Sequence, residues 1–171
     1  SDSVTVGSTG QFSDKNAGTG KTVNVAGTVS GTDAGNYDVT FNTTTTADID
    51  RRAITGTITA DNKIYDGNTN AVTQGDLSRG GLNGVVANDS VTVGSTGQFS
   101  DKNAGQGKTV NVAGTVTGAD ADNYDVTFNT TTQADIDKRA ITGTITADNK
   151  IYDGNTNAVT QGELSRGGLN G

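Results

Sequence analysis

The sequence predicts an all-β protein made of tandem copies of a small antiparallel β-sandwich, with nearly no helix. Residues 2–84 match residues 89–171 at all but seven of 83 positions, which is the mark of an array of structural units. A unit of 87 residues is large enough to close a small core of its own. Apolar residues alternate with polar ones along several short segments, and no window shows the period of an amphipathic helix. An immunoglobulin-like sandwich is the leading fold, and a β-grasp-like sheet fold is the alternative.

At each position where the two copies differ, both residue types can lie in a solvated loop or on an outward strand face. They are Thr19/Gln106, Ser30/Thr117, Thr32/Ala119, Gly35/Asp122, Thr46/Gln133, Arg51/Lys138 and Asp76/Glu163. No apolar core candidate changes, so both copies are expected to encode the same unit.

The first predicted strand of the period covers residues 54–60. Ile54, Ile58 and Ala60 share one face there, and three threonines share the other, which is the period of a half-buried strand. Asp, Asn and Gly between residues 61 and 68 predict turns because these residues tolerate turn dihedral angles. A second strand is expected at residues 70–74.

Further strands are predicted beyond the Gly-rich stretch that begins at Arg79. They cover residues 89–93, 108–112, 123–129 and 134–137. In the third of these, Tyr124, Val126 and Phe128 alternate with polar residues and are expected to point inward. Each unit therefore has six or seven short strands separated by Gly, Asn and Asp turns.

The composition excludes several classes of function. The chain has no Cys and no His, which removes disulfides, thiolate metal sites and the commonest general base. No nucleophile and base pair is visible at any spacing, so we predict that the chain is not an enzyme and has no catalytic or cofactor-binding residues. A net charge of -7 with scattered Lys and Arg argues against nucleic acid, and no segment is apolar enough for membrane insertion. The chain has no initiator Met or signal peptide, so it is expected to be a piece of a longer protein.

Three blocks recur in the same order in both copies. The first block contains Lys63, Tyr65, Asp66 and Gly67, and again Lys150, Tyr152, Asp153 and Gly154; the second runs from Phe99 to Lys108, and the third from Asp120 to Tyr124. This pattern resembles the YDG and MBG-type repeats of large bacterial surface adhesins, including filamentous-haemagglutinin-like proteins. The resemblance covers essentially the whole chain. It implies an extracellular module, secreted or on the bacterial cell surface, that occurs in many copies in a stalk.

The register of that family divides the chain into three parts. Residues 1–53 would be the last part of one unit, residues 54–139 a complete unit, and residues 140–171 the first part of the next. The alternative phase uses the Gly-rich stretch at residues 80–88 as the boundary and gives units 1–88 and 89–171. In the first register an incomplete sandwich exposes strand edges, so we expect the two end pieces to complete each other head to tail between molecules.

Four further patterns were considered as candidate sites. Asp120, Asp122 and Asp125 offer oxygen ligands at a spacing that suits calcium, although Asp122 is replaced by Gly35 in the first copy. Residues 17–22 resemble the end of a phosphate-binding loop but lack its first Gly and its helix, so a hairpin turn is predicted there. Lys63 or Lys102 is a candidate for an isopeptide bond to an Asn or Asp. The residues Tyr65, Asp66 and Gly67 are predicted to be structural rather than a recognition motif.

The sequence thus predicts a non-catalytic structural spacer that carries a distal binding region of an adhesin away from the cell. The alternative is a cell adhesion module in which each unit binds a glycan or calcium weakly, and many copies together bind strongly. An exposed platform of aromatic side chains would favour the alternative. The chain has only four Tyr and four Phe, and the alternation places most of them inward.

Overall fold

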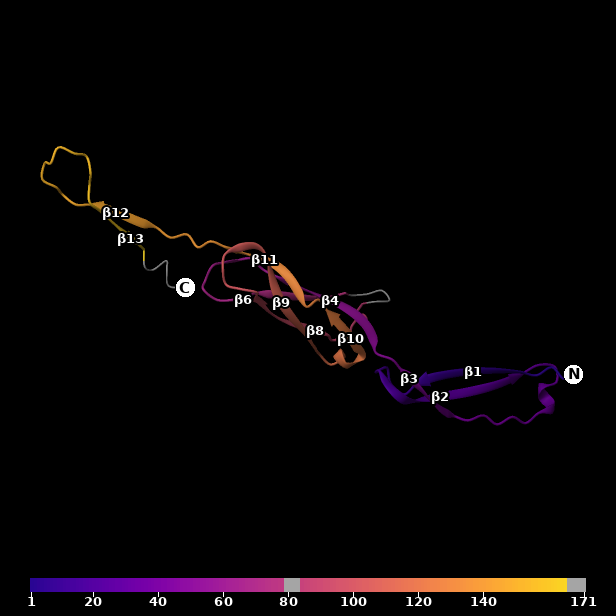
Figure 1. Ribbon diagram of the computed structural model, residues 1–171. Helices are drawn as coiled ribbons and strands as arrows, with labels where there is room; N and C mark the ends of the chain where they lie inside the picture. Colours follow the sequence, from indigo (N-terminus) through magenta and orange to yellow (C-terminus); the bar gives the residue numbers. More distant parts are fainter. Residues whose placement is uncertain (79–83, 166–171) are drawn as a thin grey trace. The chain divides into compact units, whose positions relative to one another are not determined.

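The computed structural model describes residues 1–78 and 84–165, and its fold is nearly all β (Figure 1). About 56% of the described residues are in strands and 4% are helical. In the described residues the helical part consists of two short 3₁₀ turns, η1 (Ala34–Asn36) and η2 (Ala121–Asn123). The prediction of an all-β chain with nearly no helix is confirmed.

The strands of the described residues are as follows. They are β1 (Thr5–Phe12), β2 (Gly18–Ser30), β3 (Thr44–Ile49), β4 (Arg52–Ala60), β5 (Lys63–Ile64), β6 (Asn70–Ala71), β7 (Thr73–Leu77), β8 (Thr92–Phe99), β9 (Gly105–Thr117), β10 (Tyr124–Phe128), β11 (Thr131–Asp137), β12 (Gly143–Ala147) and β13 (Thr160–Leu164).

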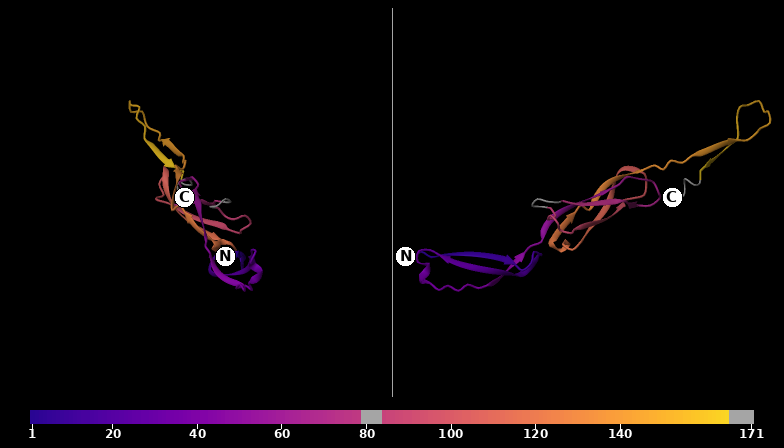
Figure 2. Two further views of the ribbon diagram at one scale, coloured as in Figure 1. Left: turned by 90° about the vertical axis from the view of Figure 1, so that its right-hand side faces the viewer. Right: turned by 180° about the vertical axis from the view of Figure 1, so that it is seen from behind.

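Four sheets are present in the described part of the chain. Their strand orders are β1-β2-β3, β10-β4-β7, β5-β11-β9-β8-β6 and β12-β13. The β5–β11 pair is parallel, whereas β9–β11 and β6–β8 in the same sheet are antiparallel, so this sheet is mixed. Both views of Figure 2 show the orange-to-yellow segment with β12 and β13 running out and returning as one hairpin.

The chain groups into two compact units, each assembled from separate segments. The first contains Ser1–Gly56, Leu77–Val93 and Val116–Thr127, and the second contains Thr57–Asp76, Gly94–Thr115 and Phe128–Gly171. The predicted boundaries of the sequence repeats remain a prediction. The alternative boundary at residues 80–88 falls partly on residues 80–83, which lie outside the described residues.

The core of the second unit lies between two sheets. Ile58 of β4 packs against Val110 of β9 and Ile136 of β11, and at most 1% of each of these side chains is exposed. Phe99 and Ala134 belong to the same cluster. Because β4 is in the three-stranded sheet and the others are in the five-stranded sheet, two sheet layers face each other here, as in a sandwich.

In the first unit, apolar burial is concentrated around β4 and the segment before β8. Ile54, Leu77, Val85, Val91 and Tyr124 are buried there. The sheet β1-β2-β3 also belongs to this unit.

Most of the predicted strands are present. The strand at residues 54–60 is confirmed as β4, with Ile54 and Ile58 buried and the threonines exposed. Residues 108–112 and 134–137 are confirmed as parts of β9 and β11. The strand predicted at 123–129 is confirmed as the slightly shorter β10. The strand predicted at 70–74 is interrupted at Val72, between β6 and β7.

The strand predicted at residues 89–93 begins only at Thr92. The residues before it are held in a turn instead. Asn88 has a φ of 71°, and Asp89 and the backbone N–H of Ser90 are both engaged in polar contacts. Because of these contacts, residues 89–91 do not form the strand that the alternation predicted.

Identical sequences have different structures in the two copies. Residues 124–128 form β10 beside β4, whereas residues 37–41, with the same sequence, form no strand. Residues 63–64 form β5 beside β11, whereas residues 150–151 form none. In both cases only one copy has a partner strand in the described structure, so these segments become strands because of the partner and not because of local propensity.

Candidate functional site

The block that begins at Lys63 folds into a turn around the lysine amino group, and residues 63–70 are called the Lys63 turn. Lys63 Nζ donates to Asp66 Oδ1 at 2.8 Å and to the backbone carbonyl of Asn68 at 2.9 Å. It also donates to Asn68 Oδ1 at 3.1 Å and to the carbonyl of Asn70 at 3.0 Å. Four oxygen atoms from one short segment therefore surround a single cation whose side chain is 16% exposed.

Asp66 and Asn68 each make a second contact within the Lys63 turn. Asp66 Oδ1 accepts the backbone N–H of Asn68 at 3.1 Å, and Asn68 Oδ1 accepts that of Asn70 at 2.9 Å. Gly67 has a φ of 83°, in the left-handed region that favours glycine. Bonding to Lys63, and then to the Asn68 N–H, holds the pKa of Asp66 below its ordinary value. The spacing of the motif thus follows from one closed hydrogen-bonded turn.

Tyr65 anchors the Lys63 turn to the body of the second unit. Its backbone N–H donates to the carbonyl of Asp137 at 2.9 Å, and its half-buried ring packs against the core. Lys63 Nζ also lies 5.5 Å from the centre of the Phe99 ring, within the range of a cation–π contact. In this copy the structure places Lys63, Tyr65, Asp66 and Gly67 together in one packed turn.

The same turn forms in the second copy of the motif. Lys150 Nζ donates to Asp153 Oδ1 at 2.9 Å and to the Asn155 carbonyl at 2.8 Å, and Gly154 has a φ of 76°. Tyr152, however, is 93% exposed. The turn is therefore a local unit that closes without packing, and the tyrosine is the part that needs a core.

The two candidate isopeptide lysines lie in different surroundings. Lys63 is beside an acid and an amide, Asp66 and Asn68, but both belong to its own turn. A covalent bond there would close a loop of only a few residues and would add little stability. Lys102 is exposed. The isopeptide bond remains a prediction.

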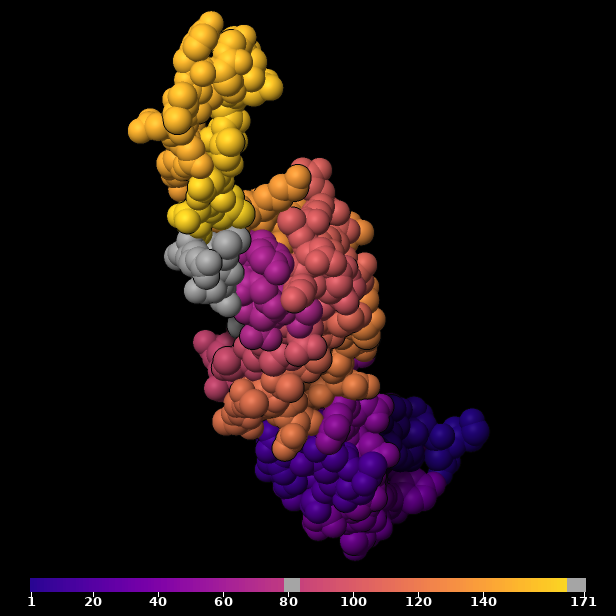
Figure 3. Space-filling model, turned by 60° about the vertical axis from the view of Figure 1, so that its left-hand side comes forward, coloured from indigo at the N-terminus to yellow at the C-terminus, as the bar shows by residue number. Residues whose placement is uncertain are grey.

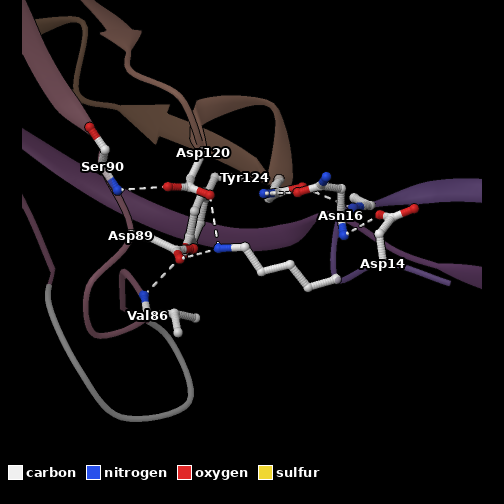
Figure 4. Close-up of polar contacts among 10 residues, drawn as sticks. Asp14, Asn16, Val86, Asp89, Ser90, Asp120 and Tyr124 are labelled. Atoms are coloured by element: carbon white, nitrogen blue, oxygen red, sulfur yellow. Dashed lines mark hydrogen bonds and ion pairs between the residues drawn. The ribbon is translucent and has the colours of Figure 1, made fainter. Parts of the chain in front are cut away.

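A second lysine, Lys15, connects the first sequence copy to the second, and its contacts are called the Lys15 joint. Lys15 Nζ lies 2.9 Å from Asp89 Oδ1 and 2.9 Å from Asp120 Oδ1. Figure 4 shows the carboxylates of Asp89 and Asp120 converging on this amino group. The lysine side chain is 67% exposed, whereas the two aspartates are only 11% and 16% exposed. The acceptor side is thus the preorganised half of the contact.

Neighbouring groups hold both carboxylates in place. The N–H of Ser90 donates to Asp120 Oδ2 at 2.9 Å, and the Tyr124 hydroxyl donates to Asp89 Oδ2 at 2.7 Å. The Tyr124 oxygen in turn accepts the N–H of Val86 at 2.9 Å (Figure 4). Each aspartate therefore offers one oxygen to its own copy and the other to Lys15.

Two asparagines extend the joint beside the lysine. The N–H of Ala17 donates to Asn123 Oδ1 at 2.8 Å, and Asn123 Nδ2 donates to Asn16 Oδ1 at 3.3 Å. These uncharged bonds fix the direction in which the loop of the first copy approaches η2 of the second. The ion pairs of Lys15 attract the two copies to each other, and the hydrogen bonds of Asn16 and Asn123 orient them.

The electrostatics of the joint are mutual. The bond to Asp89, followed by that to Asp120, raises the pKa of Lys15 well above its ordinary value. The bond from Lys15, and then that from Tyr124, lowers the pKa of Asp89. The pKa of Asp120 is lowered mainly by the N–H of Ser90 and then by Lys15. All three groups are therefore held in their charged forms around neutral pH.

The acceptor half of the joint is also built in the first copy. Asp33 Oδ2 accepts the N–H of Ser3 at 2.8 Å, and the Tyr37 hydroxyl donates to Asp2. These contacts repeat those of Asp120 and Asp89, 87 positions earlier. The joint is not among the features that the sequence predicts. The recurrence of Lys15, Asp2 and Asp33 as Lys102, Asp89 and Asp120 is the signal that points to it.

The structure does not gather the three calcium candidates into a site. Asp120 is bonded to Ser90 and Lys15, whereas Asp122 and Asp125 are exposed. Within residues 1–78 and 84–165, no group of three or more His, Cys, Asp or Glu side chains is placed to hold a metal ion.

The predicted hairpin at residues 17–22 is present. β1 and β2 pair antiparallel as far as Phe12 and Val23, and the N–H of Ser13 donates to the carbonyl of Thr22, so residues 17–22 lie in the connection between the two arms. Gly18 pairs with Ile49 and Lys21 with Ala47, so the residues between them are a bulge inside β2. The N–H of Gly20, which has a φ of 61°, donates to Asp48 Oδ1 at 2.7 Å. The Asp48 carboxylate therefore already accepts the hydrogen bond that the Gly20 N–H would donate to a phosphate.

Among the described residues, no helix has the length and apolar character needed to cross a membrane.

Comparison with known proteins gives one match. The model of the YDG domain family matches residues 1–47 and 50–134. Neither a search of curated proteins nor a search of solved structures returned a match. The matched segments contain the Lys63 turn and both sides of the Lys15 joint, and they cover most of the chain. The chain therefore belongs to the YDG domain family.

Proposed function

We propose that this chain is a non-catalytic spacer from the stalk of a bacterial adhesin of the filamentous-haemagglutinin-like kind, secreted or displayed on the cell surface. It would carry a distal binding region away from the cell. Near-identity of the copies supports this role, because a spacer gains reach by repeating one unit. Membership of the YDG domain family and the all-β fold are consistent with it.

The observation that carries the proposal is the Lys15 joint. A lysine of one copy is held between two shielded aspartates of the next, and an amide pair beside it fixes the orientation. A joint of this kind restricts the angle between successive copies without a disulfide. The same residues recur with each copy, so an array would have the same joint at every boundary.

The alternative role is a repeated glycan- or calcium-binding module, and it has less support. Asp120 is already bonded within the joint. Tyr65 packs against the core of the second unit, and Tyr124 is buried. The strongly exposed Tyr152 is the same residue in a segment without that packing. Its exposure reflects a missing partner strand and not a platform for a sugar.

Tandem arrays of two, three and four 87-residue periods test the spacer role by small-angle X-ray scattering. We expect the maximum dimension to increase by a constant step per copy, because a stiff array lengthens linearly whereas a flexible one grows with about the square root of the number of copies. Changing the joint lysine of every copy to Met should reduce that step. Antibodies against the chain should also label intact cells of the source organism.

A collapsed array would contradict the proposal. Glycan-array or calorimetric binding that strengthens with copy number would favour the adhesion module instead. Calcium at millimolar concentration is the control ligand, and it should leave the scattering curve unchanged.

A further inference from the structure

The apolar face of the sheet β1-β2-β3 is at most half-buried, whereas the equivalent residues are buried in the second copy. Phe12 is 39% exposed, whereas the equivalent Phe99 is 3% exposed. Ala47 is exposed, whereas Ala134 is 5% exposed. The difference arises because β8, β9 and β11 pack against the segment that contains Ile58, whereas β1, β2 and β3 have no such cover in the described residues.

The hairpin β12-β13 has the sequence of that covering segment. Residues 141–164 repeat residues 54–77 with a single change, Asp76 to Glu163. Ile145 is 77% exposed in the hairpin, whereas the equivalent Ile58 is fully buried. The hairpin is coloured yellow to orange in Figure 3. The hairpin is thus folded as a pair of strands but has no core beneath it.

In the second unit, the covering segment around Ile58 is held by specific polar contacts as well as by burial. Asn129 Oδ1 accepts the N–H of Ile58 at 2.7 Å, and Asn129 Nδ2 donates to the Ile58 carbonyl at 2.9 Å. Asn62 Oδ1 accepts the N–H of Asp135 at 2.7 Å. All of these residues have identical equivalents, which are Asn42, Ile145, Asn149 and Asp48.

The charged residues beside the hairpin and beside the sheet β1-β2-β3 are complementary in the same register. Lys102 is the equivalent of Lys15 and is exposed. Asp2 and Asp33, the equivalents of Asp89 and Asp120, are already oriented by Tyr37 and Ser3. A copy that placed its hairpin on β1-β2-β3 of another would bring Lys102 to these aspartates, because both contacts follow the same shift of 87 residues.

We propose that the chain binds a second copy of itself head to tail by strand donation. Residues 141–164 of one molecule cover the apolar face formed by residues 5–49 of the next, and Lys102 bonds to Asp2 and Asp33. Each copy contains both a donor segment, residues 141–164, and an acceptor face, residues 5–49, so copies associate head to tail. This inference goes beyond the spacer role and stands without it, because it rests only on the identity of the strands and their two environments.

Paired cysteine variants test the register directly, because the chain has no Cys of its own. Asn70 of β6 faces Gln98 of β8, and the neighbouring Phe99 N–H donates to the Thr69 carbonyl, so the 70–98 pair is the close, non-hydrogen-bonded kind. The equivalent pair between molecules is Asn157 with Gln11. Mixing Q11C with N157C under mild oxidation should give a disulfide-linked dimer, whereas T9C with N157C should not, because the register is two residues off.

Sedimentation velocity over a concentration series provides the second measurement. The mean mass should rise with concentration beyond that of a dimer. I145D should weaken association at least about a hundredfold, because a carboxylate would be buried without a partner. T146D, on the opposite face of the same strand, should leave association unchanged. Far-UV circular dichroism checks that both variants remain folded.

Two results would overturn strand donation between copies. One is a monomer mass at every concentration together with no mixed disulfide. The other is a double variant Q11C/N157C that closes only onto itself, which would show that the hairpin covers the β1-β2-β3 face of its own chain. These outcomes leave the spacer proposal untouched, since that proposal is tested on arrays.

Discussion

Isoleucine at one position of the repeat illustrates how much a residue's role depends on its surroundings. Ile58 is fully buried between two sheets, and Ile145 is 77% exposed on an isolated hairpin. The five residues on each side of the two isoleucines are the same. The chain therefore contains its own control for the effect of burial on stability.

Ile58→Ala should lower the free energy of unfolding by about 2–5 kcal/mol, because it leaves a cavity in the core of the second unit. Ile145→Ala should change it by less than about 0.5 kcal/mol, as exposed substitutions do. Urea unfolding followed by circular dichroism measures both, at concentrations where the chain is monomeric. Equal losses in the two variants would show that the hairpin is packed in solution.

At the scale of the element, the Lys63 turn shows that a charged residue can serve as the centre of a loop. Its amino group takes the place that a metal ion occupies in other oxygen-lined turns, with four oxygens within 3.1 Å. The turn closes in both copies, but only the first is attached to a core through its tyrosine.

Lys63→Met should lower the free energy of unfolding by about 1.5–3 kcal/mol, because it removes hydrogen bonds made by a charged group and leaves their acceptors without a donor. Lys150→Met should have a much smaller effect on the same transition, because its turn opens independently of the core. Thermal or urea unfolding of the two variants provides the comparison. A loss of similar size in K150M would mean that the second turn is coupled to the core.

The strands could be predicted from the sequence wherever alternation alone determines them, as in β4 and β9. The start of β8 and the bulge in β2 could not, because side chains elsewhere replace the local backbone pairing there. Nor could alternation predict the parallel pairing of β5 with β11, which joins residues more than seventy positions apart.

Across the molecule as a whole, the Lys15 joint could not be predicted from the sequence either, because it depends on contacts between residues far apart in the chain. Its ion pairs join residues 74 and 105 positions apart, and periodicity says only that such residues recur. The Lys63 turn is more accessible to prediction, because its residues are contiguous and their spacing alone indicates a structural turn. The partial burial of the two aspartates of the joint is a property of the fold and not of the local sequence.

The joint should weaken in acid. The pKa values of Asp89 and Asp120 are lowered from 3.8, so their contribution to stability is complete above about pH 4 and is lost as the pH falls through the lowered values. On the alkaline side the contribution of Lys15 persists beyond its ordinary pKa of 10.5, because that pKa is raised. Carboxyl carbon NMR titrations measure the shifts.

In K15M the pKa of Asp89 should move back toward 3.8, because Lys15 is the main cause of its shift. K102M is the matched control and should leave both aspartates unchanged, since Lys102 is exposed and lies outside the joint. Unshifted aspartates in the wild-type chain would show that the joint is open in solution.

The Lys15 joint also bears on how the gene can change. Lys15 is bonded to the copy that follows it, and both halves of this contact recur with the period of 87 residues. Unequal crossing-over between near-identical coding segments would add or delete whole periods, and each new boundary would again contain the residues of the joint. Under the proposed spacer role, length would then vary while each connection kept the same chemistry.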